Sequence, residues 1–94
     1  MIGSPVITDQ PNDVEAIQGE AITFICSADA EPLHTTLWYF HGDKLSNSSK
    51  YRIGDMTLIV FDLTLDDAGT YSCLVVNTHG NVSASARLKV QGQT

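Results

Sequence analysis

The chain has 94 residues, five Lys or Arg against eleven Asp or Glu, and a formal net charge of −6. This length fits one domain with a modest core, because a domain of this size buries only about 60–65% of its unfolded surface. The acidic balance and the lack of a Lys/Arg stripe argue against nucleic acid or an anionic membrane as partner. The longest apolar runs, such as residues 58–61, are far shorter than a membrane span, so no direct membrane insertion is expected.

Short β-rich segments recur along the chain, separated by clusters of Gly, Pro, Asn, Asp and Ser. This pattern is typical of an all-β sandwich, and no segment of useful length has helical periodicity. Pro11 ends the first strand, because proline cannot donate a hydrogen bond to a ladder. A corner at residues 63–68 precedes the last two long strands. In chain order, the predicted strands are residues 5–8, 14–17, 21–28, 36–41, a short segment at 44–45, 51–53, 56–61, 69–77 and 81–90.

Two cysteines and the single tryptophan form the most informative motif of the chain. Cys26 lies in the predicted strand 21–28, Trp38 lies in the strand 36–41, and Cys73 ends the run Asp-Ala-Gly-Thr-Tyr-Ser-Cys. In this β-rich context the chain resembles an immunoglobulin domain over residues from about 5 to 90. The break at Pro11 and the short span before residues 51–53 resemble the I-set of that family. The resemblance implies one immunoglobulin-like I-set domain, residues 1–94, folded as a two-sheet Greek-key sandwich.

The resemblance also implies roles for the motif residues. Cys26 and Cys73 are expected to join the two sheets by a disulfide, with Trp38 packed against it and Tyr71 as the tyrosine-corner residue. Such a bond would stabilise the domain by roughly 4 kcal/mol in the chain-entropy model. The alternative is a pair of buried thiols, as in intracellular members of the family. A disulfide favours an oxidising compartment.

Strand alternation then predicts which side chains face solvent, because successive side chains point to opposite faces of a sheet. With the cysteines and the tryptophan inward, an apolar set faces outward on the strands that the family names C, F and G, which we call the C–F–G face. Apolar side chains rimmed by polar ones are typical of a protein-binding patch. One alternative is that these apolar residues are exposed singly, as is normal on protein surfaces. Another is that a neighbouring domain of the parent protein covers them. The predicted interface consists of Leu37, Tyr39, Leu74 and Val76, with Arg87 and Lys89 at its rim.

The other sheet has an outward apolar set of its own. It consists of Ile25, Ile59 and Phe61. These residues form either a second patch or ordinary strand side chains, because β-branched and aromatic residues are common in strands in general. We rank this set below the C–F–G face as an interaction site.

Two Asn-x-Ser sequons begin at Asn47 and Asn81, and both are expected in accessible positions. A sequon predicts glycosylation only in a secreted protein, and the alternative is a chance match. Both sequons are therefore predicted glycosylation sites in the extracellular interpretation.

The remaining polar residues do not form a catalytic set. Arg52 and Asp67 match the family's salt bridge, which closes one end of the sandwich. His34 and His79 are expected near each other, but they lack a third ligand for zinc. No phosphate loop, metal-binding helix motif or nucleophile elbow occurs. We therefore expect no enzyme, no cofactor and no metal.

The sequence predicts a non-catalytic protein-interaction module of an extracellular or cell-surface adhesion or receptor protein. The module would be one of several domains in its parent chain, and would bind a protein partner or a second copy through the C–F–G face. The alternative is a structural I-set module of an intracellular muscle or cytoskeletal scaffold, with reduced cysteines and unused sequons. The sequons and the cysteine pair favour the extracellular interpretation.

Overall fold

The computed structural model describes residues 3–31 and 35–92, which form ten strands and one 3-10 turn. No helix among these residues is long and apolar enough to cross a membrane. In chain order the elements are β1 (Gly3–Asp9), β2 (Val14–Ile17), β3 (Ile22–Ile25), β4 (Ser27–Glu31), β5 (Thr35–Phe40), β6 (Asp43–Lys44), β7 (Tyr51–Ile53), β8 (Thr57–Val60), η1 (Leu65–Asp67), β9 (Gly69–Asn77) and β10 (Gly80–Gln91).

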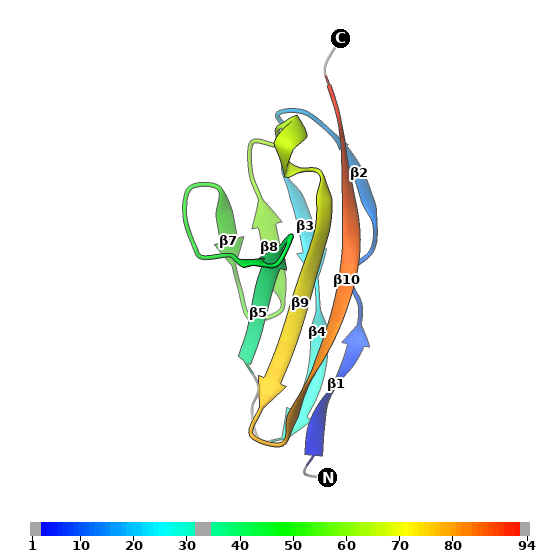
Figure 1. Ribbon diagram of the computed structural model, residues 1–94, viewed down its shortest axis with the longest axis vertical. Helices are drawn as coiled ribbons and strands as arrows, with labels where there is room; N and C mark the ends of the chain where they lie inside the picture. The colour runs from blue at the N-terminus through cyan, green and yellow to red at the C-terminus, as the bar shows by residue number, and fades with distance from the viewer. Residues whose placement is uncertain (1–2, 32–34, 93–94) are drawn as a thin grey trace.

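The strands form two facing layers (Figure 1). One layer is the five-stranded sheet β2-β10-β9-β5-β6, and the other consists of the three-stranded sheet β3-β8-β7 and the pair β1-β4. β2 runs parallel to β10, so the first strand is split between the two layers on either side of Pro11. This is the predicted all-β immunoglobulin sandwich of I-set type.

The bounds of β2, β7 and β9 match the predicted strands, but the prediction of one continuous strand over residues 21–28 is wrong. The segment divides at Cys26 because its antiparallel partner β8 begins at Thr57, opposite Ile25. The chain before Thr57 is a turn, in which the Gly54 N–H donates to the Thr57 carbonyl (2.9 Å). The Cys26 N–H donates to the Met56 carbonyl (2.8 Å), just before β8 begins. The ribbon then continues as β4 and pairs with β1 instead.

The core lies between the layers around a disulfide. Cys26 and Cys73 are bonded with their Cα atoms 6.5 Å apart, which confirms the predicted pairing. Trp38 lies directly opposite Cys73 in the register of β5 and β9, and its side chain is fully buried. The ring of Phe24 from β3 lies 6.3 Å from that of Trp38 and 5.2 Å from that of Tyr71, measured between centroids. These aromatic contacts link the two sheets.

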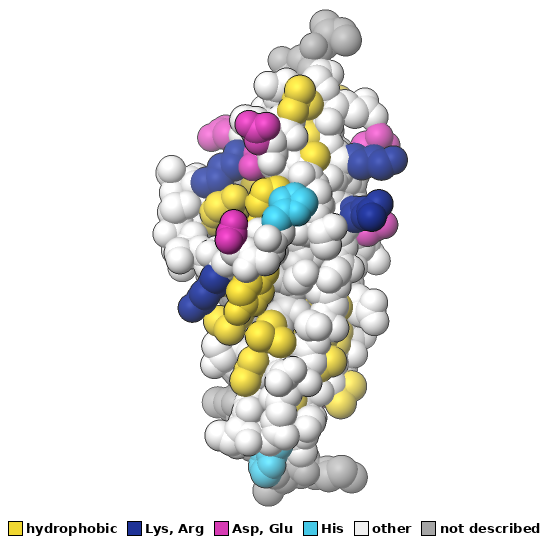
Figure 2. Space-filling model, in the orientation of Figure 1, with side chains coloured by type: hydrophobic (Ala, Val, Ile, Leu, Met, Phe, Trp, Pro, Cys, Tyr) yellow, Lys and Arg dark blue, Asp and Glu magenta, His cyan; other side chains and the backbone are white. Residues whose placement is uncertain are grey.

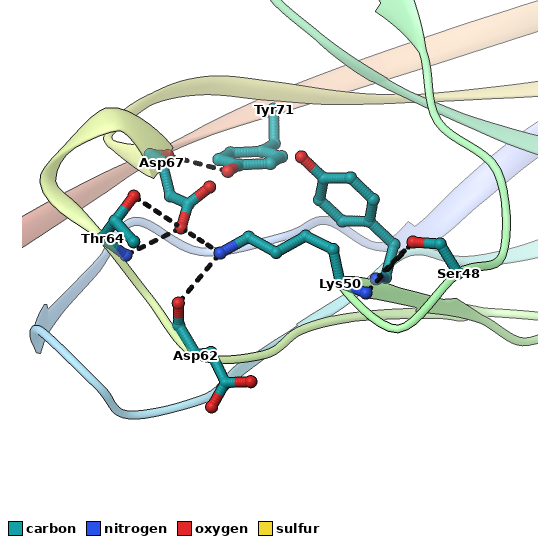
Figure 3. A network of polar contacts seen from close by, with 7 residues as sticks. Ser48, Lys50, Asp62, Thr64, Asp67 and Tyr71 are labelled. Atoms are coloured by element: carbon teal, nitrogen blue, oxygen red, sulfur yellow. Dashed lines mark hydrogen bonds and ion pairs between the residues drawn. The ribbon is translucent and has the colours of Figure 1, made fainter.

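A polar network closes one end of the sandwich (Figure 3). The side chain of Asp67 is 9% exposed, and its Oδ2 accepts hydrogen bonds from Lys50 Nζ (2.5 Å) and the Thr64 N–H (2.8 Å). Lys50 Nζ also donates to the Asp62 carbonyl (2.9 Å), and the buried Tyr71 hydroxyl donates to the Asp67 carbonyl (2.7 Å). Burial, and then the Asp67 charge, raise the pKa of the Tyr71 phenol well above its ordinary value. The network therefore ties the corner around η1 to β9 and to the start of β7.

The cation in this network is Lys50, which corrects the prediction that Arg52 pairs with Asp67. The register explains the difference. The Lys50 carbonyl accepts the Phe61 N–H, so Lys50 lies beside the chain as it enters the corner. Arg52 lies opposite Ile59, two residues farther from the corner, or about 7 Å along the strand. Its side chain is exposed on the outward face of β7.

Candidate protein-interaction face

The C–F–G face is the outward side of β5, β9 and β10. Residues with odd numbers in β5 and β10 and with even numbers in β9 point to this side, because their neighbours in the chain pack into the core. Apolar side chains gather over β5 and β9 on this side of the molecule (Figure 2). The face is therefore apolar along its middle strands.

Strand register brings the four apolar residues of the predicted interface together. Leu37 lies directly opposite Leu74, and directly opposite residues have Cβ atoms about 4.5–5.5 Å apart. A row is a pair of residues directly opposite each other on β5 and β9. Val76 lies in the next row on one side of the Leu37–Leu74 pair, and Tyr39 lies in the next row on the other side. Successive rows on one face are about 7 Å apart. The four side chains form one continuous strip from β9 to β5, which we call the apolar strip. Each of them is half-buried.

Polar side chains flank the apolar strip on both sides. Lys44 of β6 lies opposite Tyr39, and its side chain is exposed. On the other side, the outward residues of β10 beside the strip are Asn81, Ser83 and Ser85. An apolar centre with a polar rim is the composition of a protein interface. The contribution of Lys44 was missed by the sequence analysis, since it depends on the pairing of β6 with β5.

Arg87 and Lys89 lie at different distances from the apolar strip. Arg87 is one row beyond the row of Tyr39, and its backbone N–H donates to Asp13 Oδ1 (2.8 Å). Lys89 is a further row away, opposite Glu15 of the parallel strand β2. Together with the two acids these cations line a shallow depression at the β2–β10 edge, where both signs of charge are visible in Figure 2. Arg87 thus borders the strip, whereas Lys89 belongs to a mixed-charge edge.

The outward apolar set of the other sheet differs in its arrangement. Ile25 is 49% exposed, which is more than any residue of the apolar strip, while Ile59 and Phe61 are half-buried. The register places Ile25 opposite Thr57, and Ile59 opposite Arg52. Polar neighbours across the strands therefore separate these apolar side chains, and no cross-strand apolar pair comparable to Leu37–Leu74 forms.

Both sequon asparagines are exposed. Asn47 follows β6, and its Oδ1 accepts the Ile53 N–H of β7 (2.7 Å). Asn81 is near the start of β10, on the C–F–G face. His34 lies outside the described residues, so its predicted approach to His79 stays a prediction. Within residues 3–31 and 35–92, no group of three or more His, Cys, Asp or Glu is placed to hold a metal ion.

Comparison with known proteins relates this domain to parts of longer chains. Protein turtle homolog B of Rattus norvegicus is 34% identical over 89 residues, covering 94% of this chain and 7% of the relative. Contactin-4 of Rattus norvegicus is 35% identical over 79 residues, covering 84% of this chain and 8% of the relative. The chain thus spans less than a tenth of the length of these curated relatives.

Solved structures agree with the fold. The titin M4 domain has a TM-score of 0.90 and 30% identity, with 97% of this chain and 99% of that chain covered. The titin tandem A164-A165 has a TM-score of 0.88 and 33% identity, with 93% of this chain and 47% of that chain covered. The immunoglobulin I-set domain family matches residues 5–90. The chain belongs to the I-set family of immunoglobulin domains.

Proposed function

We propose that the chain is a non-catalytic interaction module of an extracellular or cell-surface adhesion or receptor protein, and that it binds protein through the C–F–G face. The observation that carries this proposal is the apolar strip, in which Leu37 and Leu74 are direct cross-strand neighbours. A continuous apolar strip with serines and Lys44 at its margins combines the apolar centre and polar rim of an interface. Tyr39 supplies an aromatic side chain, the type enriched among residues that dominate binding energy.

Three observations support the extracellular setting. The contactins and turtle homologs are cell-surface adhesion proteins. The Cys26–Cys73 disulfide is a bond typical of oxidising compartments. Asn47 and Asn81 are both exposed, as glycan acceptors must be.

The positions of the first and last strands suit a module of a longer chain. β1 begins at one end of the sandwich and β10 ends at the opposite end, so modules of this kind can be joined end to end (Figure 1).

Serine substitutions in the apolar strip test the binding face. We expect Leu37→Ser with Leu74→Ser to weaken self-association of the isolated domain, or binding of the parent protein to cells that carry its partner, at least tenfold. Sedimentation equilibrium and cell binding, both with protein that carries no glycan, measure the two cases. Ile25→Ser is the matched control, because it removes a more exposed apolar side chain from the other sheet. If the double variant keeps its melting temperature and both binding readouts are unchanged, the C–F–G face is not the site.

A second candidate function is that of a structural module in an intracellular muscle or cytoskeletal scaffold. The similarity to titin M4, which covers nearly the whole of both chains, favours it. The two functions differ in the state of the cysteines in the native source. Alkylation of the denatured protein without prior reduction, followed by mass spectrometry, distinguishes them, because denaturation exposes the two buried cysteines. An unmodified pair supports the extracellular function, and two alkylated thiols support the scaffold.

A further inference from the structure

We propose that an N-linked glycan on Asn81 shields the apolar strip, so that glycosylation of Asn81 and protein binding through the C–F–G face exclude each other. The proposal rests on the proposed extracellular function and deepens it, because it assigns a regulator to the same face. It follows from the pairing of β9 with β10, which places the sequon beside the strip.

The register of these strands gives the relationship. Asn81 lies directly opposite Val76, and Ser83, which completes the sequon, lies directly opposite Leu74. Directly opposite side chains have Cβ atoms about 4.5–5.5 Å apart. All four side chains point to the C–F–G side, since β9 and β10 alternate in step. The attachment atom of the sugar is therefore beside one end of the strip.

The size of a glycan relative to the strip gives the consequence. Two inter-strand spacings, about 10 Å in total, separate Asn81 on β10 from β5, which holds Leu37 and Tyr39. A branched chain of several sugars extends farther than this. Such a glycan on Asn81 reaches the space above Val76 and Leu74 that a bound protein partner would fill. The hydrated sugars then exclude the partner from the apolar strip.

The sequon is also open to modification. The Asn81 side chain is exposed and has no hydrogen bond within the described part of the chain. β2 pairs with β10 only from Leu88 onward, so the segment that holds the sequon has a strand partner on one side only. Asn47 differs, because its side-chain oxygen is bound to Ile53 on β7, a strand of the other sheet. Asn47 therefore provides a matched control for glycosylation away from the strip.

Carbene footprinting on domains secreted from mammalian cells tests the proposal without a partner. Intact mass and peptide mapping give the occupancy of each sequon, and a photoactivated diazirine labels accessible side chains. We expect Asn81→Gln to raise the labelling of the peptides that contain Leu37 and Leu74 severalfold over the glycosylated wild type. Asn47→Gln should label as the wild type does. Ser83→Ala removes the sequon but keeps Asn81, and should behave as Asn81→Gln.

Two results would overturn the proposal. One is an unoccupied Asn81 in protein whose Asn47 is glycosylated, and the other is equal labelling of the strip in the occupied wild type and Asn81→Gln. Melting temperatures of the variants control for the fold.

The proposed function can fail separately from the shielding. If Asn81→Gln exposes the strip but self-association of this variant does not depend on Leu37 and Leu74, shielding stands and the binding face is wrong. If association depends on the strip but labelling is equal, the binding face stands and shielding is wrong.

Discussion

The imidazole of His41 lies against the backbone of Gly69, in the space that a Cβ atom at position 69 would occupy. Gly69 has a φ of +144°, a conformation that favours glycine, and it begins β9 directly after the polar corner. The backbone N–H of His41 donates to the Thr70 carbonyl (3.3 Å), so the turn after β5 is hydrogen-bonded to the start of β9. This contact positions the strands that carry the C–F–G face.

Gly69→Ala should lower the free energy of unfolding by more than about 1 kcal/mol, because the new methyl group meets both an unfavourable φ and the His41 ring. Urea unfolding measures the change. Gly3→Ala is the matched control, since a Cβ there has no atom within 4 Å. Adding His41→Ala to Gly69→Ala should recover part of the loss, and a strictly additive double variant would show that the two residues do not interact.

Tyr71→Phe should lower the free energy of unfolding at neutral pH by about 1–2 kcal/mol, because it removes the buried hydrogen bond to the Asp67 carbonyl. Folding raises the pKa of the Tyr71 phenol above its unfolded value near 10, chiefly through burial. The corresponding stability is therefore fully present below pH 10 and is lost as the pH rises through the folded pKa. Urea unfolding between pH 7 and 11 should show the difference between wild type and Tyr71→Phe narrowing above pH 10; a constant difference would contradict the shift.

Lys50→Met should lower the free energy of unfolding by about 1–2 kcal/mol, because it leaves the nearly buried Asp67 carboxylate without its cation. The expected loss is smaller than for a fully buried ion pair, because the Lys50 side chain is 30% exposed and water screens its interaction with Asp67. Arg52→Met is the control and should change stability by less than about 0.5 kcal/mol. Equal losses for the two variants, measured by thermal or urea unfolding, would mean that the arginine shares the role of the lysine.

Reduction of the Cys26–Cys73 disulfide should lower the free energy of unfolding by about 2–5 kcal/mol. The bond closes a long loop, and its loss gives the unfolded chain more freedom. Melting with and without reductant measures the effect, and the Cys26→Ala, Cys73→Ala double variant should be insensitive to reductant. Identical melting of the wild type under both conditions would indicate that the thiols are free in the protein used.

Much of the candidate site follows from the sequence because strand alternation has a period of two. Once Cys26, Trp38 and Cys73 are inward, the side on which each residue of β5 and β9 lies is determined without coordinates. This is why Leu37 and Leu74 were expected on one outward face, where the structure places them as direct neighbours.

The errors have a common cause in the pairing of segments that are distant in the chain. The division of a predicted strand at Cys26 depends on where β8 begins, and the choice of Lys50 over Arg52 depends on the register of β7 against β8. Alternation cannot distinguish Lys50 from Arg52, because residues two apart share a face. Only their positions along the partner strand separate them.

By itself, the order of residues determined the all-β class of fold, because the spacing of β-rich segments and turn residues is local. Once the family resemblance placed Cys26, Trp38 and Cys73 inward, strand alternation also determined which side of each strand faces solvent. The disulfide was implied by the resemblance, and the tertiary structure confirmed it. Only the tertiary structure decided that Asn81 stands beside Val76, that Lys44 borders Tyr39 and that Lys89 belongs to another edge. Neighbours across strands are set by register, and register is a property of two paired segments together.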